Sequence, residues 1–221
     1  MIRLLLAAIV MVAASSGLAA REIRGGAPGD FDLYLLALTW SPGFCATGGA
    51  AKQPDQCDIG SRLGFLVHGL WPQGERDFPT ECNPGAFVQR RDLAATRGVM
   101  PSEGLARYEW RKHGTCSGLS PARYFEAMAT LYRRIAIPET YRNPGQDSRA
   151  APIEIERAFS QANPGLRPDM MTVVCGRGER GSVLTELRIC LSKDLRNFRA
   201  CPAQLQVQGC RTRNILIPAL N

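Results

Sequence analysis

The sequence predicts one domain of the α+β class over residues 21–221. Amphipathic patterns typical of helices occupy the middle of the chain. Because strands and helices are mixed without regular βαβ alternation, we expect an α+β fold and not a doubly wound one. Bulky apolar runs typical of buried strands lie on both sides of the helical part, at residues 31–40, 62–72, 170–176 and 182–192.

Residues 1–20 are typical of an export signal. Arg3 precedes an apolar run over residues 4–14, and the small residues SSGLAA that follow suit cleavage after Ala19 or Ala20. A membrane anchor is the alternative, but the run is shorter than the roughly 20 apolar residues that a span needs. We therefore expect a periplasmic or extracellular mature protein with no membrane span.

The chain is basic. Its formal net charge is +7, and removal of residues 1–20, which carry one basic residue and no acids, leaves +6. In an exported protein this favours a polyanionic partner, namely nucleic acid, an anionic glycan or a membrane surface. The excess is modest, so composition alone leaves these partners open.

The first two predicted strands frame a loop. Residues 31–40, FDLYLLALTW, are apolar and predict a buried strand. Residues 41–57 are rich in turn residues, and a bond between Cys45 and Cys57 would close them. A second buried strand is predicted over residues 62–72, RLGFLVHGLWP, which ends in a glycine and proline turn.

The helical patterns follow. Residues 85–98 are compatible with a helix, and residues 102–113 predict one that opens with Ser102 as N-cap and stops at Gly114. Residues 120–137 form the clearest amphipathic helix, with apolar residues every three or four positions at Tyr124, Met128, Leu131 and Ile135.

Residues 138–151 resemble a loop. A domain boundary there is the alternative, but the pieces on either side are too small to fold separately. A helix over residues 152–163 and the strands over 170–176 and 182–192 come next, and the tail carries the last cysteines.

The even number of cysteines in an exported chain argues for disulfides, although spacing alone does not give their connectivity. His113 and Cys116 have the spacing of half a zinc site, but the chain has only two histidines and no Cys-x-x-Cys pair. We therefore expect neither a metal nor another cofactor. The eight cysteines are Cys45, Cys57, Cys82, Cys116, Cys175, Cys190, Cys201 and Cys210.

The segment YEWRKHGTC, residues 108–116, brings together chemically active side chains. On a helix Glu109 shares one face with Lys112 and His113, since residues three and four apart are neighbours. The structural alternative is a solvated ion pair at a helix end, which stabilises by about 0.2–0.5 kcal/mol.

The other histidine, His68, lies in FLVHGLWP, inside an apolar strand next to a turn. A hydrogen-bonded core histidine is the alternative there. Together, two imidazoles can act as acid and base on a phosphodiester, so that a 2′-hydroxyl attacks phosphorus. Lys112 would stabilise the charge that develops. DNA would bind but not react, because it lacks this hydroxyl.

FLVHGLWP and YEWRKHGTC resemble, in order and separation, the two active-site segments of the ribonuclease T2 family. Further similarity comes from LALTWSPGFC, CNPGAF and LTELRICLS, and it spans roughly residues 31–210. The resemblance implies a central antiparallel β-sheet with helices packed against it.

The resemblance also implies roles. His113 matches the residue usually assigned as general base and His68 the acid, while Glu109 and Lys112 match residues that assist at the phosphate. Trp71 matches an aromatic of a base pocket, which fits base stacking; a core position is its alternative. We interpret Trp110 as a core residue.

The implied disulfides are Cys82–Cys116, Cys175–Cys210 and Cys190–Cys201, which leaves Cys45–Cys57. The chain departs from the family where many members have a histidine before the motif glutamate, since Tyr108 stands there. Tyr108 donates a hydrogen bond but carries no positive charge, which predicts lower phosphate affinity. Gln73 takes a base-reading position, Arg76 and Asp77 follow it, and Thr39 replaces a glutamine. Base preference therefore does not carry over.

We expect an exported, monomeric, metal-independent endoribonuclease. It would cleave single-stranded RNA to 2′,3′-cyclic phosphates and then 3′-phosphates, with Trp71, Gln73 and Tyr108 binding substrate and no stable DNA partner. Three alternatives stay open: a binding protein on the same fold, a zinc hydrolase that uses free cysteines, and a phosphodiesterase for small nucleotides.

Overall fold

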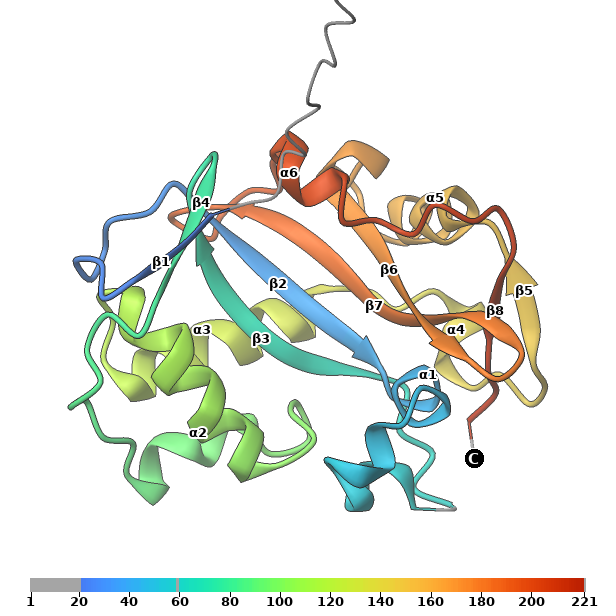
Figure 1. The fold of residues 1–221 in the computed structure, drawn as a ribbon, viewed down its shortest axis with the longest axis horizontal. Coiled ribbons are helices and arrows are strands. Elements are labelled where there is room, and N and C mark those ends of the chain that lie inside the picture. Colours follow the sequence, from blue (N-terminus) through green and yellow to red (C-terminus); the bar gives the residue numbers. More distant parts are fainter. Residues whose placement is uncertain (1–20, 59, 221) are drawn as a thin grey trace, which may run out of the picture.

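A computed structural model describes residues 21–58 and 60–220 (Figure 1). The predicted export signal lies outside the described residues. A central sheet runs through the molecule in the strand order β3-β2-β7-β8-β5, with β6 paired to β7. Its strands are β2 (Leu33–Trp40), β3 (Phe65–Gln73), β5 (Ser148–Ala150), β6 (Met171–Gly178), β7 (Gly181–Ser192) and β8 (Ile215–Ile217).

The pairings among β3, β2, β7 and β6 are antiparallel, as expected, and so is that of β5 with β8. One pairing is parallel, between β7 and β8. A small separate sheet joins β1 (Arg21–Arg24) to β4 (Asp77–Thr80) in parallel. The predicted α+β class is therefore confirmed, with a sheet that is mixed because β7 and β8 run parallel.

The described residues contain six α-helices. They are α1 (Ser41–Ala46), α2 (Glu103–Lys112), α3 (Pro121–Arg134), α4 (Glu139–Arg142), α5 (Pro152–Ala162) and α6 (Ala203–Gln206). The predicted N-cap of α2 is present, because the Ser102 hydroxyl accepts a hydrogen bond from the Leu105 amide at 3.1 Å. None of the helices in this part of the chain is long and apolar enough to cross a bilayer.

Two expectations are corrected. Residues 85–98 do not form an α-helix but carry a 3₁₀ helix at Arg90–Thr96, since turn residues flank a short apolar stretch. Residues 138–151 are not only loop, because they contain α4 and β5. Such short elements lack a periodic pattern of their own and form only where neighbours supply partners.

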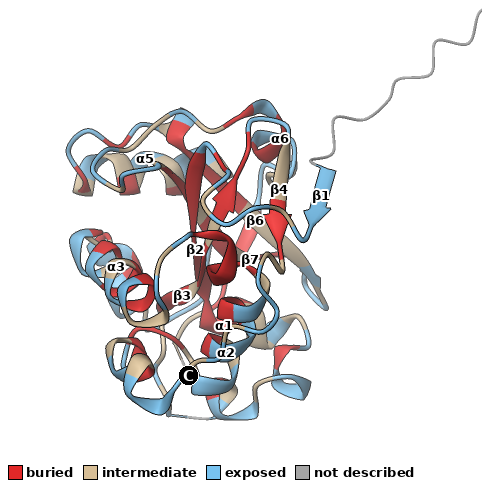
Figure 2. Ribbon diagram, turned by 90° about the vertical axis from the view of Figure 1, so that its left-hand side faces the viewer, coloured by how far each residue is buried: buried red, intermediate tan, exposed pale blue. Residues whose placement is uncertain are grey.

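The two faces of the sheet differ (Figure 2). Helices α3 and α5 lie against one face, where alternate residues of β2 join the main hydrophobic core. Trp110 belongs to this core and is 3% exposed, as interpreted from the sequence. On the other face a small cluster is formed by Leu33, Leu35, Cys190 and Leu205, with Trp71 at its edge. The rest of this second face lines two cavities that are open to solvent.

Four disulfides connect the described residues, and their pairings are those that the family resemblance implies. They are Cys45–Cys57, Cys82–Cys116, Cys175–Cys210 and Cys190–Cys201. All eight cysteines are thus engaged, and no free thiolate is left to bind zinc in this part of the chain.

Candidate active site

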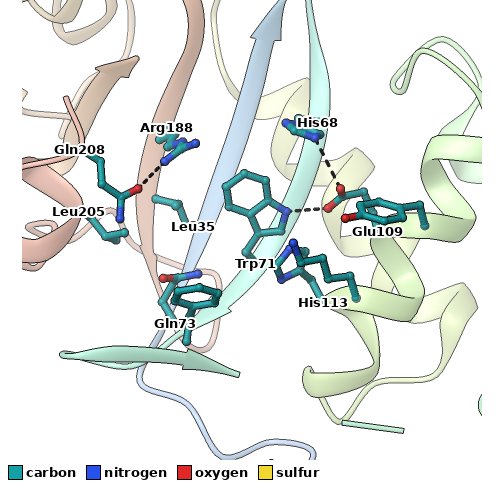
Figure 3. Close-up of a pocket in the computed structure, with 12 residues that line it drawn as sticks. Leu35, His68, Trp71, Gln73, Glu109, His113, Arg188, Leu205 and Gln208 are labelled. Atoms are coloured by element: carbon teal, nitrogen blue, oxygen red, sulfur yellow. Dashed lines mark hydrogen bonds and ion pairs between the residues drawn. The ribbon is translucent and has the colours of Figure 1, made fainter. Parts of the chain in front are cut away.

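A cleft of about 290 Å³ opens on the second face of the sheet, between β3, β7 and α2 (Figure 3). Both histidines of the chain line it. The structure therefore brings together residues that the sequence places more than forty positions apart. The lining residues are Leu35, His68, Trp71, Gln73, Phe78, Tyr108, Glu109, Lys112, His113, Arg188, Leu205 and Gln208.

A β-bulge places His68. The pairing register between β2 and β3 shifts at Ala37, and His68 is left as the extra residue on β3. In a regular strand, residues three apart lie on opposite faces. With the bulge, His68 and Trp71 both line the cleft, while Val67 and Leu70 both enter the core.

His68 lies between two carboxylates. Its Nδ1 is 2.6 Å from Glu186 Oε1, and its Nε2 is 3.5 Å from Glu109 Oε1. Burial lowers the pKa of His68, but the hydrogen bond to Glu186 and the charges of both glutamates outweigh burial, so the pKa is raised. His68 is thus biased toward the protonated form, and its side chain is 34% exposed, which does not fit the alternative of a core histidine.

Sequence reasoning missed Glu186 and Arg188. Arg188 Nε donates to Glu186 Oε2 at 2.9 Å, and one of its terminal nitrogens donates to Gln208 Oε1 at 2.7 Å. The guanidinium also lies 5.3 Å from the Trp71 ring centre. The sequence did contain a signal for them. Two charged residues stand at alternate positions of a mostly apolar strand, which places both on the same face.

Helix α2 supplies the opposite wall. Its end is held next to β4, because the Lys112 backbone carbonyl accepts a hydrogen bond from the Glu81 amide at 2.8 Å and Cys82 is bonded to Cys116. His113 follows the last helical residue, and its amide donates to the Glu109 carbonyl at 2.8 Å. The predicted grouping of Glu109, Lys112 and His113 therefore lines the cleft.

Glu109 is buried, with 1% exposure, and is not the solvated residue of the ion-pair alternative. Trp71 Nε1 donates to Glu109 Oε2 at 2.6 Å. Burial raises the pKa of Glu109, against the lowering effects of His68, Trp71 and Lys112. The close approach needs a glycine at position 69, because a Cβ there would collide with the Glu109 carboxylate and the Trp71 indole nitrogen.

His113 has a drier environment than His68. It is 6% exposed, and its ring centre lies 5.2 Å from that of Trp71 at an interplanar angle of 34°. Within the described part of the chain its Nδ1 is buried without a hydrogen-bond partner. Burial, with the positive charges of Lys112 and His68, lowers the pKa of His113 to about 3. The imidazole is therefore neutral at pH 7.

The residues predicted to bind substrate lie around this centre. Trp71 is partly exposed and packs between the cleft and the Leu33 cluster, so it combines its predicted site role with the core alternative. Gln73 ends β3 and lines the cleft at 4% exposure. Tyr108 is 43% exposed at the cleft wall, and Lys112 Nζ lies 5.9 Å from its ring centre.

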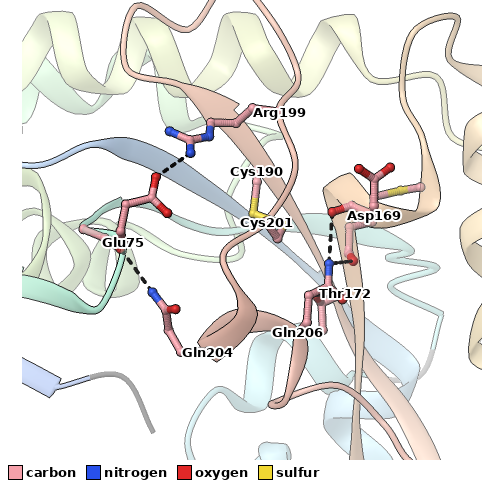
Figure 4. Close-up of a disulfide and its surroundings, with 10 residues drawn as sticks. Glu75, Asp169, Thr172, Cys190, Arg199, Cys201, Gln204 and Gln206 are labelled. Atoms are coloured by element: carbon pink, nitrogen blue, oxygen red, sulfur yellow. Dashed lines mark hydrogen bonds and ion pairs between the residues drawn. A yellow bond between two sulfur atoms is a disulfide. The ribbon is translucent and has the colours of Figure 1, made fainter. Parts of the chain in front are cut away.

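The C-terminal tail completes the cleft (Figure 4). Cys190 of β7 is bonded to Cys201, and Arg199 pairs with Glu75 at 2.5 Å on the neighbouring loop. Gln206 of α6 donates to the Asp169 carbonyl at 3.0 Å. These links fix α6, and so place two further cleft-lining residues, Leu205 and Gln208.

A second cavity of about 330 Å³ meets the first at His68 and Tyr108. It contains Glu186 but not His113. The loop closed by Cys45–Cys57 forms part of its wall. Its other lining residues are Thr39, Phe44, Lys52, Gln53, Gln56, Leu105 and Thr185.

The chain resembles known ribonucleases. A ribonuclease from Aeromonas hydrophila is 34% identical over 188 residues, which cover 82% of this chain and 81% of the relative. Ribonuclease I of Escherichia coli is 33% identical over 147 residues, covering 48% of this chain and 55% of the relative. The structure of ribonuclease MC1 from bitter gourd seeds superposes with a TM-score of 0.63 at 20% identity, over 84% of this chain and 99% of that one, which shows a shared fold.

The family model described as "Ribonuclease T2 family" matches residues 31–201. This range contains β2, β3, α2 and β7, the elements that carry both histidines and their partners. The match covers well over half of the chain, and the Aeromonas relative extends across most of both sequences. The chain therefore belongs to the ribonuclease T2 family.

Proposed function

We propose that this protein is an exported, metal-independent endoribonuclease that cleaves single-stranded RNA by transesterification. The observation that carries the proposal is the pair of imidazoles on either side of one Trp71–Glu109 hydrogen bond, with ring centres 5.3 Å (His68) and 5.2 Å (His113) from that of Trp71. One imidazole is biased toward the cation and the other toward the neutral form. This is the division that an acid and a base require.

In the first step the 2′-hydroxyl of the 5′-side nucleoside attacks the adjacent phosphorus. Neutral His113 accepts the hydroxyl proton, and the bond from phosphorus to the 5′ oxygen breaks. Protonated His68 supplies a proton to that leaving oxygen. The products are a 2′,3′-cyclic phosphate and a free 5′-hydroxyl, and each proton transfer contributes roughly 10²–10⁴-fold to the rate.

The second step opens the cyclic phosphate with water. His68, now neutral, takes a proton from the water molecule that attacks phosphorus. The bond from phosphorus to the 2′ oxygen breaks, and His113, now protonated, returns a proton to that oxygen. The product is a 3′-phosphate, and both histidines recover their starting charges.

Two neighbours assist. Lys112 lies next to His113 and supplies positive charge where the phosphorane oxygens become negative. An anionic phosphate beside His113 also opposes the effect of Lys112 on its pKa, which improves the base once substrate is bound. Glu109 accepts a hydrogen bond from Trp71 and faces His68 Nε2, so it connects α2 to the β3 side of the site.

The two cavities suggest where the nucleosides bind. The first cavity contains both histidines and suits the nucleoside that carries the attacking hydroxyl. The second is lined by His68 but not by His113, so it suits the leaving nucleoside, whose 5′ oxygen needs only the acid. Bases must enter these cavities unpaired, which favours single-stranded RNA.

The test compares RNA and DNA polymers of matched sequence, with EDTA present and oxidatively folded protein. We expect acid-soluble nucleotide from RNA only, and a rate lower by about 10²–10⁴-fold in His68→Ala or His113→Ala despite intact folding by circular dichroism. Cleavage of DNA would show that water is the nucleophile and would overturn the mechanism. Cleavage of neither polymer would favour a binding protein on this fold.

A further inference from the structure

We propose that Glu186, held in place by Arg188, is a positioning residue that orients His68 and maintains its proton for the leaving group. This inference rests on the proposed function and deepens it. It assigns a role to two β7 residues that lie outside the two histidine segments.

The hydrogen-bond geometry at His68 supports this role. Nδ1 lies 2.6 Å from Glu186 Oε1, a distance typical of a charge-assisted hydrogen bond. When Nδ1–H donates to a carboxylate, the ring orientation is fixed and Nε2 becomes the nitrogen that exchanges the catalytic proton. Nε2 is also the nitrogen that faces α2 across the cleft, 3.5 Å from Glu109.

Glu109 is less suited than Glu186 to orient His68. Its Oε2 accepts a hydrogen bond from Trp71, its Oε1 lies 3.5 Å from His68 Nε2, and burial raises its pKa. Burial alone would also raise the pKa of Glu186, but the bond with His68 and the charge of Arg188 lower it to about 2. Glu186 therefore remains ionised beside His68 down to low pH.

Arg188 fixes Glu186 from its other side. The guanidinium donates to Glu186 Oε2 at 2.9 Å, so both carboxylate oxygens have a partner. It is restrained in turn by Gln208 at 2.7 Å and by the Trp71 ring. The charge and hydrogen bond of this guanidinium both lower the pKa of Glu186.

The charged groups around His68 come from two elements. Strand β7 contributes Glu186 and Arg188, and the end of α2 contributes Glu109, Lys112 and His113. Two positive neighbours and two carboxylates thus oppose one another. Of the two carboxylates, Glu186 is in direct contact with His68 at 2.6 Å, whereas Glu109 lies 3.5 Å away, so Glu186 has the larger influence on the charge of His68.

The decisive variant is Glu186→Gln, which keeps the shape and an oxygen acceptor for Nδ1–H but removes the charge. In a pH profile of kcat/KM the basic limb reports loss of the proton from the acid. We expect this limb to move to lower pH, and kcat/KM at neutral pH to fall roughly 10- to 100-fold, as is typical when a supporting hydrogen-bond partner is changed. Glu126→Gln is the matched control, because Glu126 is exposed on α3, a helix that covers the opposite face of the sheet (Figure 2), and its profile should equal that of wild type.

The chain has only two histidines, so an untagged sample gives two imidazole signals by NMR. The His68 signal should titrate at lower pH in Glu186→Gln, and Glu186→Asp, which keeps the charge, should restore the midpoint but not the full rate. These titrations apply even where the Gln variant is less stable, since folding is followed in the same spectra.

The outcomes separate the two proposals. If His68→Ala loses most of its RNA cleavage while Glu186→Gln keeps the wild-type basic limb and His68 midpoint, the role of Glu186 is wrong and the proposed function stands. If His68→Ala cleaves RNA at the wild-type rate, the proposed function itself is wrong. A reduced rate in Glu186→Gln with an unmoved basic limb would make Glu186 a structural residue only.

Discussion

The two histidines occupy opposite kinds of environment within one cleft. His68 lies on a β-bulge between two carboxylates, and its side chain is 34% exposed. His113 follows a helix end and is almost fully buried against an indole, and the charges of Lys112 and His68 both lower its pKa. The same side chain therefore takes opposite charge preferences, because the charges that surround it differ in sign between the two positions.

The strongest test of this contrast uses a changed leaving group. We expect His68→Ala to lose about 10²–10⁴-fold with an RNA dinucleotide but little with an analogue whose 5′ oxygen is sulfur, because a thiolate leaves without a proton. His113→Ala should be slow with both substrates. Initial rates measured by chromatography decide this, and the reverse pattern would exchange the roles of the two residues.

The second test measures the two imidazoles directly. By NMR, His68 should titrate above the ordinary histidine value of 6.5, and His113 should stay neutral until the pH approaches 3. The stabilisation linked to His113 is therefore complete above pH 6.5 and is lost as the pH falls through 3. That linked to His68 is complete below pH 6.5 and is lost as the pH rises through its raised folded pKa. Similar midpoints for both signals would refute the contrast.

Lys112 tests the positive side of the cleft. We expect Lys112→Ala to lower kcat by about 10²-fold while KM changes little, since its charge acts on the transition state. Arg111→Ala is the matched control, because this neighbouring cation is exposed and does not line the cleft. A raised KM with kcat intact would make Lys112 a simple binding residue.

The smallest effect concerns packing at the bulge. Gly69→Ala should destabilise the protein by about 1–3 kcal/mol, because the new methyl collides with the Glu109 and Trp71 side chains. Gly104→Ala, at an exposed position of α2 with room for a Cβ, should instead stabilise by about 0.5–1 kcal/mol. Thermal unfolding measures both, and a Gly69→Ala protein as stable as wild type would contradict the close approach.

Apolar patterning predicted β2, β3, α2 and α3 because each makes its own local pattern. The grouping of His68 with the end of α2 came from family resemblance together with the scarcity of histidines. Glu186 was not predicted, because its contact with His68 spans 118 positions and depends on strand order.

The bulges also escaped prediction. The register shifts at His68 on β3 and at Thr185 on β7 arise from pairing with β2 and β6, not from any local pattern. A strict two-residue alternation would have put Leu184 on the same face as Glu186, whereas Leu184 lies in the core. Nonlocal register thus decides which charged residues reach the cleft.

The disulfides predict that the activity of this protein depends on whether its compartment is oxidising or reducing. Cys82–Cys116 fastens the end of α2 that carries His113, and Cys190–Cys201 fastens β7 to the tail that completes the cleft. A chain kept in a reducing compartment lacks both fastenings, so we expect it to be far less active there than after oxidation, as paired assays with and without a thiol reductant would measure. Under the proposed export, the disulfides would therefore protect the RNA of the cell that makes the protein, because the chain would become fully active only after oxidation.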